Sequence, residues 1–133
     1  MKRRLARIKA VQSLFQVEMS GTDKDEAINN VLGENEEKDA FLEQLVTGTL
    51  EYLKDIDEIF TSHLLNWKLE RVSNVDRTVI RIAIYEMKYV TEIPINVSLN
   101  EAIDIAKGFG GDESGRFVNG VLSKVADTLE IKE

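Results

Sequence analysis

Apolar residues recur at the three- and four-residue spacing of an α-helix through almost the whole chain, and this periodicity is the strongest constraint on its fold. In the first segment Leu5, Ile8 and Phe15 fall on one helical face. No run shows the strict alternation of apolar and polar residues that is typical of a half-buried strand. The length of 133 residues suits one domain. We therefore predict a single all-α domain over residues 1–133.

Glycines, a single proline and cap-forming residues divide this pattern into about seven helices. Three start signals are the clearest: Asn35, the pair Ser73 and Asp76, and a capping box of Ser98 and Glu101, in which hydroxyl and carboxylate each satisfy a free backbone N–H. A long pattern after residue 36 is expected to break near residues 54 and 55, because globular helices are seldom so long. The expected helices cover about residues 1–19, 23–32, 36–54, 55–66, 73–93, 98–107 and 114–129.

Charge is distributed unevenly along the chain. The net charge is -7, yet residues 1–17 carry five cations and no acid, so 12 cations face 24 acids in the remainder. Arg3 and Arg7 share a helical stripe with Ala10 and Leu14, which places guanidinium groups beside a packing face. A basic segment on an acidic body favours local binding of an anion such as RNA. The alternative is an ordinary charged N-terminus.

No residue pattern points to catalysis or to a bound metal. The chain has no cysteine and one histidine, His63, which we expect to be partly buried and hydrogen-bonded. The glycines from 108 to 115 lack the Gly-Lys-Ser/Thr of a phosphate-binding loop and follow a helix, so we expect a helix terminator and hinge there. No carboxylate pair stands out as a general acid and base. We therefore expect neither an enzyme nor a cofactor.

The sequence also predicts a location. The N-terminal segment has no apolar core long enough for a secretory signal. No stretch approaches the roughly 18 consecutive apolar residues of a membrane span. A chain without cysteine needs no oxidising compartment. We expect a cytoplasmic protein that does not enter a membrane.

Three stretches together resemble the NusB family of transcription antitermination factors. They are KRRLARIKAVQSLF (2–15), WKLERVSNVDRTVIRIAIYE (67–86), and the block from IPINVSLNEAIDIAKGFG (93–110) to SGRFVNGVLSK (114–124). The last block is the most specific. The resemblance implies two perpendicular three-helix bundles, with helical subdomains of about 1–66 and 67–133.

The resemblance also implies a function. A bacterial protein of this family would bind boxA RNA in nascent ribosomal RNA transcripts together with NusE, a small-subunit ribosomal protein. The pair would join other Nus factors on RNA polymerase and promote processive transcription without catalysis. Three alternatives stay open: a helical protein-protein adaptor without specific RNA binding, an RNA-binding domain like that fused to ribosomal RNA methyltransferases, and an enzyme of unknown type.

Candidate site residues follow from both lines of reasoning. The cations of the first turns suit phosphate binding and base stacking, and five phosphate contacts would give a logarithmic salt slope of about -3.5 on single-stranded RNA. The resemblance adds an aromatic and a cation to the RNA path and places the partner contacts. The predicted RNA-binding residues are Lys2, Arg3, Arg4, Arg7, Lys9, Arg116 and Phe117, and the predicted partner-binding residues are Phe15, Asp76, Phe109, Glu113 and Phe117.

Overall fold

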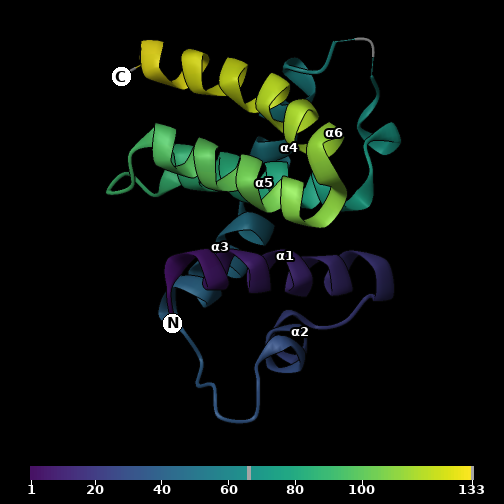
Figure 1. Ribbon diagram of the computed structural model, residues 1–133, viewed down its shortest axis with the longest axis vertical. Coiled ribbons are helices and arrows are strands. Elements are labelled where there is room, and N and C mark those ends of the chain that lie inside the picture. Colours follow the sequence, from purple (N-terminus) through teal and green to yellow (C-terminus); the bar gives the residue numbers. More distant parts are fainter. Residues whose placement is uncertain (66, 133) are drawn as a thin grey trace.

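The computed structural model describes residues 1–65 and 67–132, with side chains as far as residue 130. This part of the chain is all-α, as predicted, and has six α-helices where about seven were expected. The elements are α1 (Arg3–Ser20), α2 (Lys24–Val31), α3 (Ala40–Glu51), α4 (Leu53–Ser62), the 3-10 turn η1 (Leu69–Arg71), α5 (Asn74–Tyr89) and α6 (Ile95–Lys132). Figure 1 shows α1, α2 and α3 in the lower half of the molecule and α4, α5 and α6 in the upper half.

The last two expected helices form one bent helix, α6. Its backbone leaves helical geometry at Gly111, where φ is 78° and ψ is -170°. Glycine adopts this φ without the steric penalty that a side chain would add, so the glycine run breaks the helix as expected. The predicted start at the capping box is wrong. Helix α6 begins directly after Pro94, whose carbonyl accepts from the N–H groups of Val97 and Ser98 at 3.0 and 3.3 Å.

Two other helix starts show how local signals compete. The Ser73 hydroxyl accepts from the N–H of Asp76 at 3.2 Å, which confirms the predicted cap of α5. The predicted cap at Asn35 is wrong, because α3 begins five residues later. Its N-cap is Asp39, whose carboxylate accepts from two backbone N–H groups at 3.0 Å.

The long helical pattern is interrupted at Tyr52, between α3 and α4. The Tyr52 N–H still donates to the carbonyl of Gly48 at 3.0 Å, but its φ of -103° and ψ of 20° turn the chain. The break therefore comes slightly before the expected position near Lys54 and Asp55. The expected helix end near Asn66 lies outside the described residues.

Helix α5 is the centre of the core. It contacts α1, α3, α4 and α6, and nearly every residue from Asp76 to Met87 is buried. A helix that is buried on nearly all sides needs neighbours around it, and this one also buries charged residues such as Glu86. Helix α1 packs against α2, α3 and α5, so its N-terminal turns are held beside the start of α3 and the first half of α6. This packing positions the candidate site.

Candidate nucleic-acid interface

The exposed cations of the site lie at the N-terminus of α1. Lys2 and Arg3 are exposed and form no ion pair with any residue that the structure describes. Arg4 is also exposed, but its guanidinium donates to Glu101 and Asp104 of α6, the latter at 3.1 Å. The bond to Glu101 raises the pKa of Arg4. Such exposed pairs contribute at most about 1 kcal/mol, so a phosphate can compete for Arg4. We call Lys2, Arg3 and Arg4 the α1 patch.

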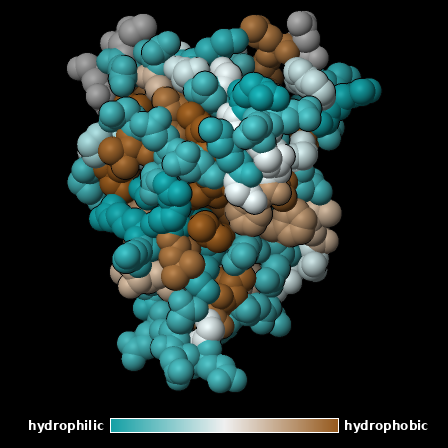
Figure 2. Space-filling view, in the orientation of Figure 1, coloured by the Kyte–Doolittle hydropathy of each residue, from teal (hydrophilic) through white to brown (hydrophobic). Residues whose placement is uncertain are grey.

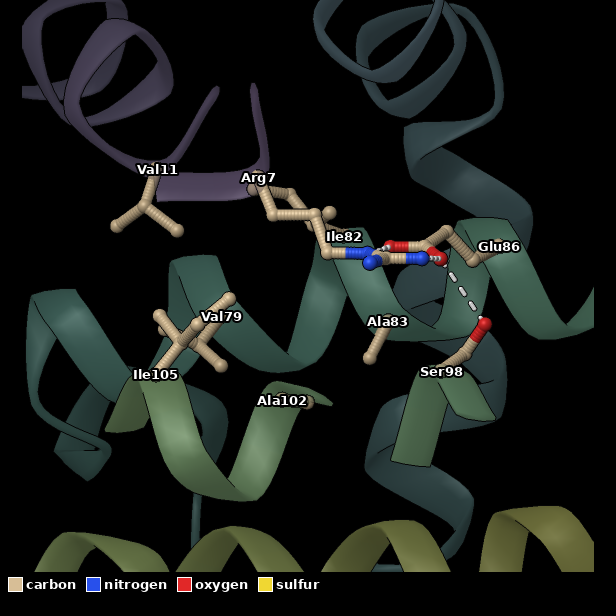
Figure 3. Close-up of a pocket in the computed structure, with 9 residues that line it drawn as sticks. All are labelled: Arg7, Val11, Val79, Ile82, Ala83, Glu86, Ser98, Ala102 and Ile105. Atoms are coloured by element: carbon tan, nitrogen blue, oxygen red, sulfur yellow. Dashed lines mark hydrogen bonds and ion pairs between the residues drawn. The ribbon is translucent and has the colours of Figure 1, made fainter. Parts of the chain in front are cut away.

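Arg7 does not belong to this patch, which corrects the sequence prediction. Its side chain is only 4% exposed and forms a bidentate pair with Glu86 of α5, with Nε and Nη2 at 2.9 and 2.8 Å from the carboxylate oxygens. Its Nη1 donates to Glu101 at 3.1 Å. Figure 3 shows the guanidinium of Arg7 against Glu86, with the Ser98 hydroxyl donating to the same carboxylate at 2.9 Å. Arg7 therefore joins α1, α5 and α6 and has no free face for a phosphate.

Lys9 is likewise occupied within the fold. Its Nζ donates to the carbonyl of Val31 at 2.7 Å and to Glu36 at 2.8 Å. The same carboxylate accepts from the N–H of Gly33 at 2.6 Å. The hydrogen bond from Lys9, followed by that from Gly33, lowers the pKa of Glu36. Lys9 thus fastens the loop after α2 to α1, and the exposed basic surface shrinks from five cations to the three of the α1 patch.

Arg116 and Phe117, the other predicted RNA contacts, lie in the C-terminal segment of α6. Arg116 is exposed and has no ion pair among the described residues. Phe117 is half-buried, and its ring meets that of Trp67 edge-on, with centroids 6.4 Å apart. Trp67 is 52% exposed, so it offers an apolar surface beside Phe117. The sequence patterns did not single out Trp67 as a site residue.

The predicted partner-binding residues lie around two neighbouring hollows. Phe15 and Phe109 line the first hollow together with Val75. Asp76, Glu113 and Phe117 line the second, which also contains Gly110 and Trp67. The two hollows are neighbours because consecutive residues line them: residues 75 and 109 line the first hollow, and residues 76 and 110 line the second.

This aromatic surface (Phe15, Phe109, Phe117, Asp76 and Glu113) is partly apolar and partly acidic. Phe109 is 42% exposed, Phe15 and Phe117 are half-buried, and Asp76 is 8% exposed. Figure 2 shows hydrophobic side chains at several places on this face, among them a group at mid-height, with hydrophilic side chains between them. Half-buried aromatic rings beside carboxylates suit a protein partner that supplies apolar and cationic groups.

Sequence reasoning missed the residues that fix the site. Glu86 is an acid at one of the positions that the apolar periodicity of α5 assigns to the core, and that placement was the available signal for a buried charge partner. Ser98 and Glu101 have the composition of a capping box but bond to Glu86 and Arg7 instead. Phe41 of α3 lies under the guanidinium of Arg3, and its place in the apolar pattern indicated only core packing.

The remaining predictions concern groups outside this surface. His63 is half-buried, its Nδ1 lies 2.7 Å from the carbonyl of Ile59 and its Nε2 lies 2.9 Å from Thr128 Oγ1, which confirms a hydrogen-bonded histidine. Within the described ranges, His, Asp and Glu side chains form no group of three placed to share a metal ion. None of the helices in the described part of the chain is long and apolar enough to cross a membrane.

Comparison with known proteins agrees with this architecture. The NusB family model matches residues 4–127. The transcription antitermination protein NusB of Bacillus licheniformis is 54% identical over 130 residues, which cover 98% of this chain and 100% of that protein. The structure of NusB from T. maritima is 38% identical, with a TM-score of 0.86, over 96% of this chain and 92% of that one.

A further solved structure contains the antitermination factors NusB and NusE in complex with double-stranded RNA. The matching chain is 25% identical, with a TM-score of 0.84, and the match covers 95% of this chain and 96% of that one. Sequence and structure thus agree over nearly the whole length, and the chain belongs to the NusB family of transcription antitermination proteins.

Proposed function

We propose that this protein binds the boxA segment of nascent ribosomal RNA jointly with NusE, and that the pair joins other Nus factors on RNA polymerase to keep transcription processive. The observation that carries the proposal is that α1 contributes to both surfaces, the α1 patch at its start and Phe15 of the aromatic surface nearer its end. The resemblance to a solved NusB–NusE complex with RNA supports this arrangement. The protein would act by assembly rather than catalysis, in the bacterial cytoplasm.

The α1 patch supports weak RNA binding that needs a partner. Guanidinium forks grip phosphates and stack on splayed bases. Three phosphate contacts give a logarithmic salt slope of about -2 on single strands, below the -3.5 expected from five. The net charge of -7 disfavours RNA elsewhere on the surface. A second protein that extends the RNA track would therefore raise both affinity and selectivity.

The aromatic surface is the proposed site for NusE. Its rings offer apolar contact area, and Asp76 and Glu113 add negative charge. RNA-binding proteins commonly carry excess positive charge, so such a partner complements these acids. In the proposed division of the chain into helical bundles of about residues 1–66 and 67–133, the first bears the α1 patch and the second bears most of the NusE surface.

Fluorescence anisotropy tests this function. A short boxA RNA and a scrambled RNA are titrated with the protein alone and with NusE present. We expect selective binding of boxA that NusE strengthens, and a loss of at least tenfold when Lys2 and Arg3 are both replaced by alanine. Lys124→Ala is the matched control, because Lys124 is an exposed cation of α6 without an ion pair among the described residues. Arg7 is left intact, because its loss would perturb the fold.

A helical protein-protein adaptor without specific RNA binding is the second candidate function, and it predicts no preference for boxA. The internal pairing of Arg7 and Lys9 favours it, because this pairing leaves only a small basic surface. Equal and feeble binding of both RNAs, unchanged by the Lys2 and Arg3 substitutions while NusE is still captured, would overturn the RNA-binding function and leave a protein adaptor.

A further inference from the structure

Arg3 is exposed and without a carboxylate partner among the described residues, yet its side chain has a defined packing partner. Its guanidinium carbon lies 4.5 Å from the centroid of the Phe41 ring, within the range of a cation–π interaction. The guanidinium carbon of Arg7 lies 5.3 Å from the same centroid. The Phe41 ring, which is half-buried at the start of α3, is therefore shared by an internal and an external cation.

The surroundings of Phe41 fix it in place. Arg7 is held by the buried carboxylate of Glu86, so the internal cation cannot move away from the ring. Asp39, two residues before Phe41, accepts from the N–H of Phe41 itself at 3.0 Å, and its carboxylate also lies 3.6 Å from the N-terminal amine. The Asp39 carboxylate is thus paired with backbone N–H groups and the N-terminal amine, and the contact that the structure gives for the Arg3 guanidinium is the Phe41 ring.

We propose that Phe41 is a positioning residue for RNA binding, which holds the Arg3 guanidinium so that one unpaired base of single-stranded RNA stacks on it. The inference rests on the proposed function, because it requires RNA at the α1 patch. An Arg guanidinium stacks on aromatic faces, and a nucleobase presents such a face whatever its sequence. Holding the guanidinium beforehand lowers the entropy lost on binding. Lys2 and Arg4, on either side, would then contact the flanking phosphates.

Three substitutions separate this role from simple packing. Phe41→Leu keeps an apolar side chain at the start of α3 but removes the ring, and should weaken boxA binding about two- to fivefold. Phe41→Tyr keeps a ring face and should restore binding. Arg3→Lys keeps the charge and hence the salt slope, but loses the planar group and should weaken binding about fivefold or more.

The decisive experiment uses boxA RNAs that each lack one base, titrated in the presence of NusE against the unmodified protein and these variants. With the unmodified protein, one abasic position should weaken binding about fivefold or more, since stacking of a single base has about this effect. In Phe41→Leu and in Arg3→Lys, the same abasic position should have little further effect, while the other positions behave as before. Thermal unfolding of each variant is measured alongside.

The outcomes distinguish the two proposals. If Phe41→Leu weakens binding to every RNA equally, or leaves the sensitive position as it was, Phe41 only packs and the inference is overturned while the proposed function stands. If Phe41→Leu does not fold, Arg3→Lys decides, because Arg3 is exposed. If the unmodified protein does not prefer boxA to a scrambled RNA, both proposals are overturned.

Discussion

The buried pair of Arg7 and Glu86 makes a direct prediction about what Arg7 does. Replacing Arg7 by alanine leaves the Glu86 carboxylate buried with only the Ser98 hydroxyl as hydrogen-bond partner, because Glu86 is 2% exposed. Removing one member of a buried ion pair costs about 3–5 kcal/mol, most of it from the charge left without compensation. Arg7→Ala should therefore destabilise the fold more than it changes the RNA surface.

The size of this effect can be set against the whole fold. A domain of 133 residues is expected to have a free energy of unfolding of about 5–15 kcal/mol. Its unfolding entropy, at about 2.1 cal/mol/K per residue, converts a loss of 3–5 kcal/mol into a melting temperature lower by about 10–18 °C. Arg3→Ala is the matched control from the same helix, and should change the unfolding free energy by no more than about 1 kcal/mol, since Arg3 is exposed and loses only its contact with the Phe41 ring.

The assay is thermal and urea denaturation followed by circular dichroism, together with RNA binding at a temperature at which every variant is folded. A double variant, Arg7→Met with Glu86→Leu, replaces the pair by apolar side chains among neighbours such as Val11 and Ile82. Replacing a buried ion pair in this way is often neutral or stabilising by about 1–4 kcal/mol. The double variant should therefore recover the stability lost in Arg7→Ala and bind RNA within about twofold of the unmodified protein.

Two results would refute this reasoning. One is an Arg7→Ala variant that keeps its stability within about 1 kcal/mol and loses RNA affinity, because Arg7 would then contact RNA. The other is a double variant that is stable but no longer binds RNA. Either result would return Arg7 to the basic surface that the sequence predicted.

Three further predictions concern pH, packing and the partner surface. Hydrogen bonds from Lys9 and from a backbone N–H lower the pKa of Glu36 in the folded protein. The charged Glu36 carboxylate therefore stabilises the fold above its ordinary pKa of 4.5, and this stabilisation is lost as the pH falls through the lowered pKa. Below pH 4.5 the Glu36→Gln variant should therefore lose less of its free energy of unfolding with falling pH than the unmodified protein. Identical acid-unfolding curves for the two proteins would contradict the pairing of Glu36 with Lys9. In Gly48→Ala the new Cβ would lie 2.1 Å from the ring of Tyr85, so the free energy of unfolding, measured by urea denaturation, should fall by about 1–3 kcal/mol. In Gly120→Ala the new Cβ meets nothing within 4 Å, so the free energy of unfolding should rise by about 0.5–1 kcal/mol. The reverse order would contradict the packing of α3 against Tyr85. Phe109→Ala should change the free energy of unfolding by no more than about 1 kcal/mol, because the side chain is 42% exposed. Its affinity for NusE, measured by surface plasmon resonance, should fall tenfold or more. An unchanged affinity would remove Phe109 from the partner surface.

Local patterns predicted the helices well and failed where a distant partner decided the outcome. The cap of α5 at Ser73 depends on atoms three residues away, and the structure confirms it. Ser98 and Glu101 satisfy the same kind of local rule, but the chain continues as a helix from Ile95 through both of them. Their side chains bond to Glu86 and Arg7, and the latter is 94 residues from Glu101. No local rule contains a contact of that range.

The basic segment shows a similar limit, with one usable signal. Charge counting treats the five cations of the first turns alike, whereas the structure buries one and pairs another internally. Arg7 shares a helical stripe with Ala10 and Leu14, and both of these are buried. A cation on a stripe that faces the core is expected to have a buried acid as partner, and Glu86 within the apolar pattern of α5 was such an acid. The two signals identify the pair only when read together, across 79 residues.

The same ion pair bears on how RNA and NusE would cooperate. Glu101 of α6 bonds to Arg4 of the α1 patch and to Arg7, and Phe109 of the aromatic surface lies about two turns further along that helix. The α1 patch and Phe109 thus lie on helices that a buried pair holds together, and Phe109 comes before the break at Gly111. Cooperation between the partners then needs no change of shape, because NusE can strengthen binding by extending the RNA track and raising the effective concentration of RNA at the α1 patch. On this view the apolar double variant at Arg7 and Glu86, which keeps the helices packed, keeps the enhancement by NusE as well.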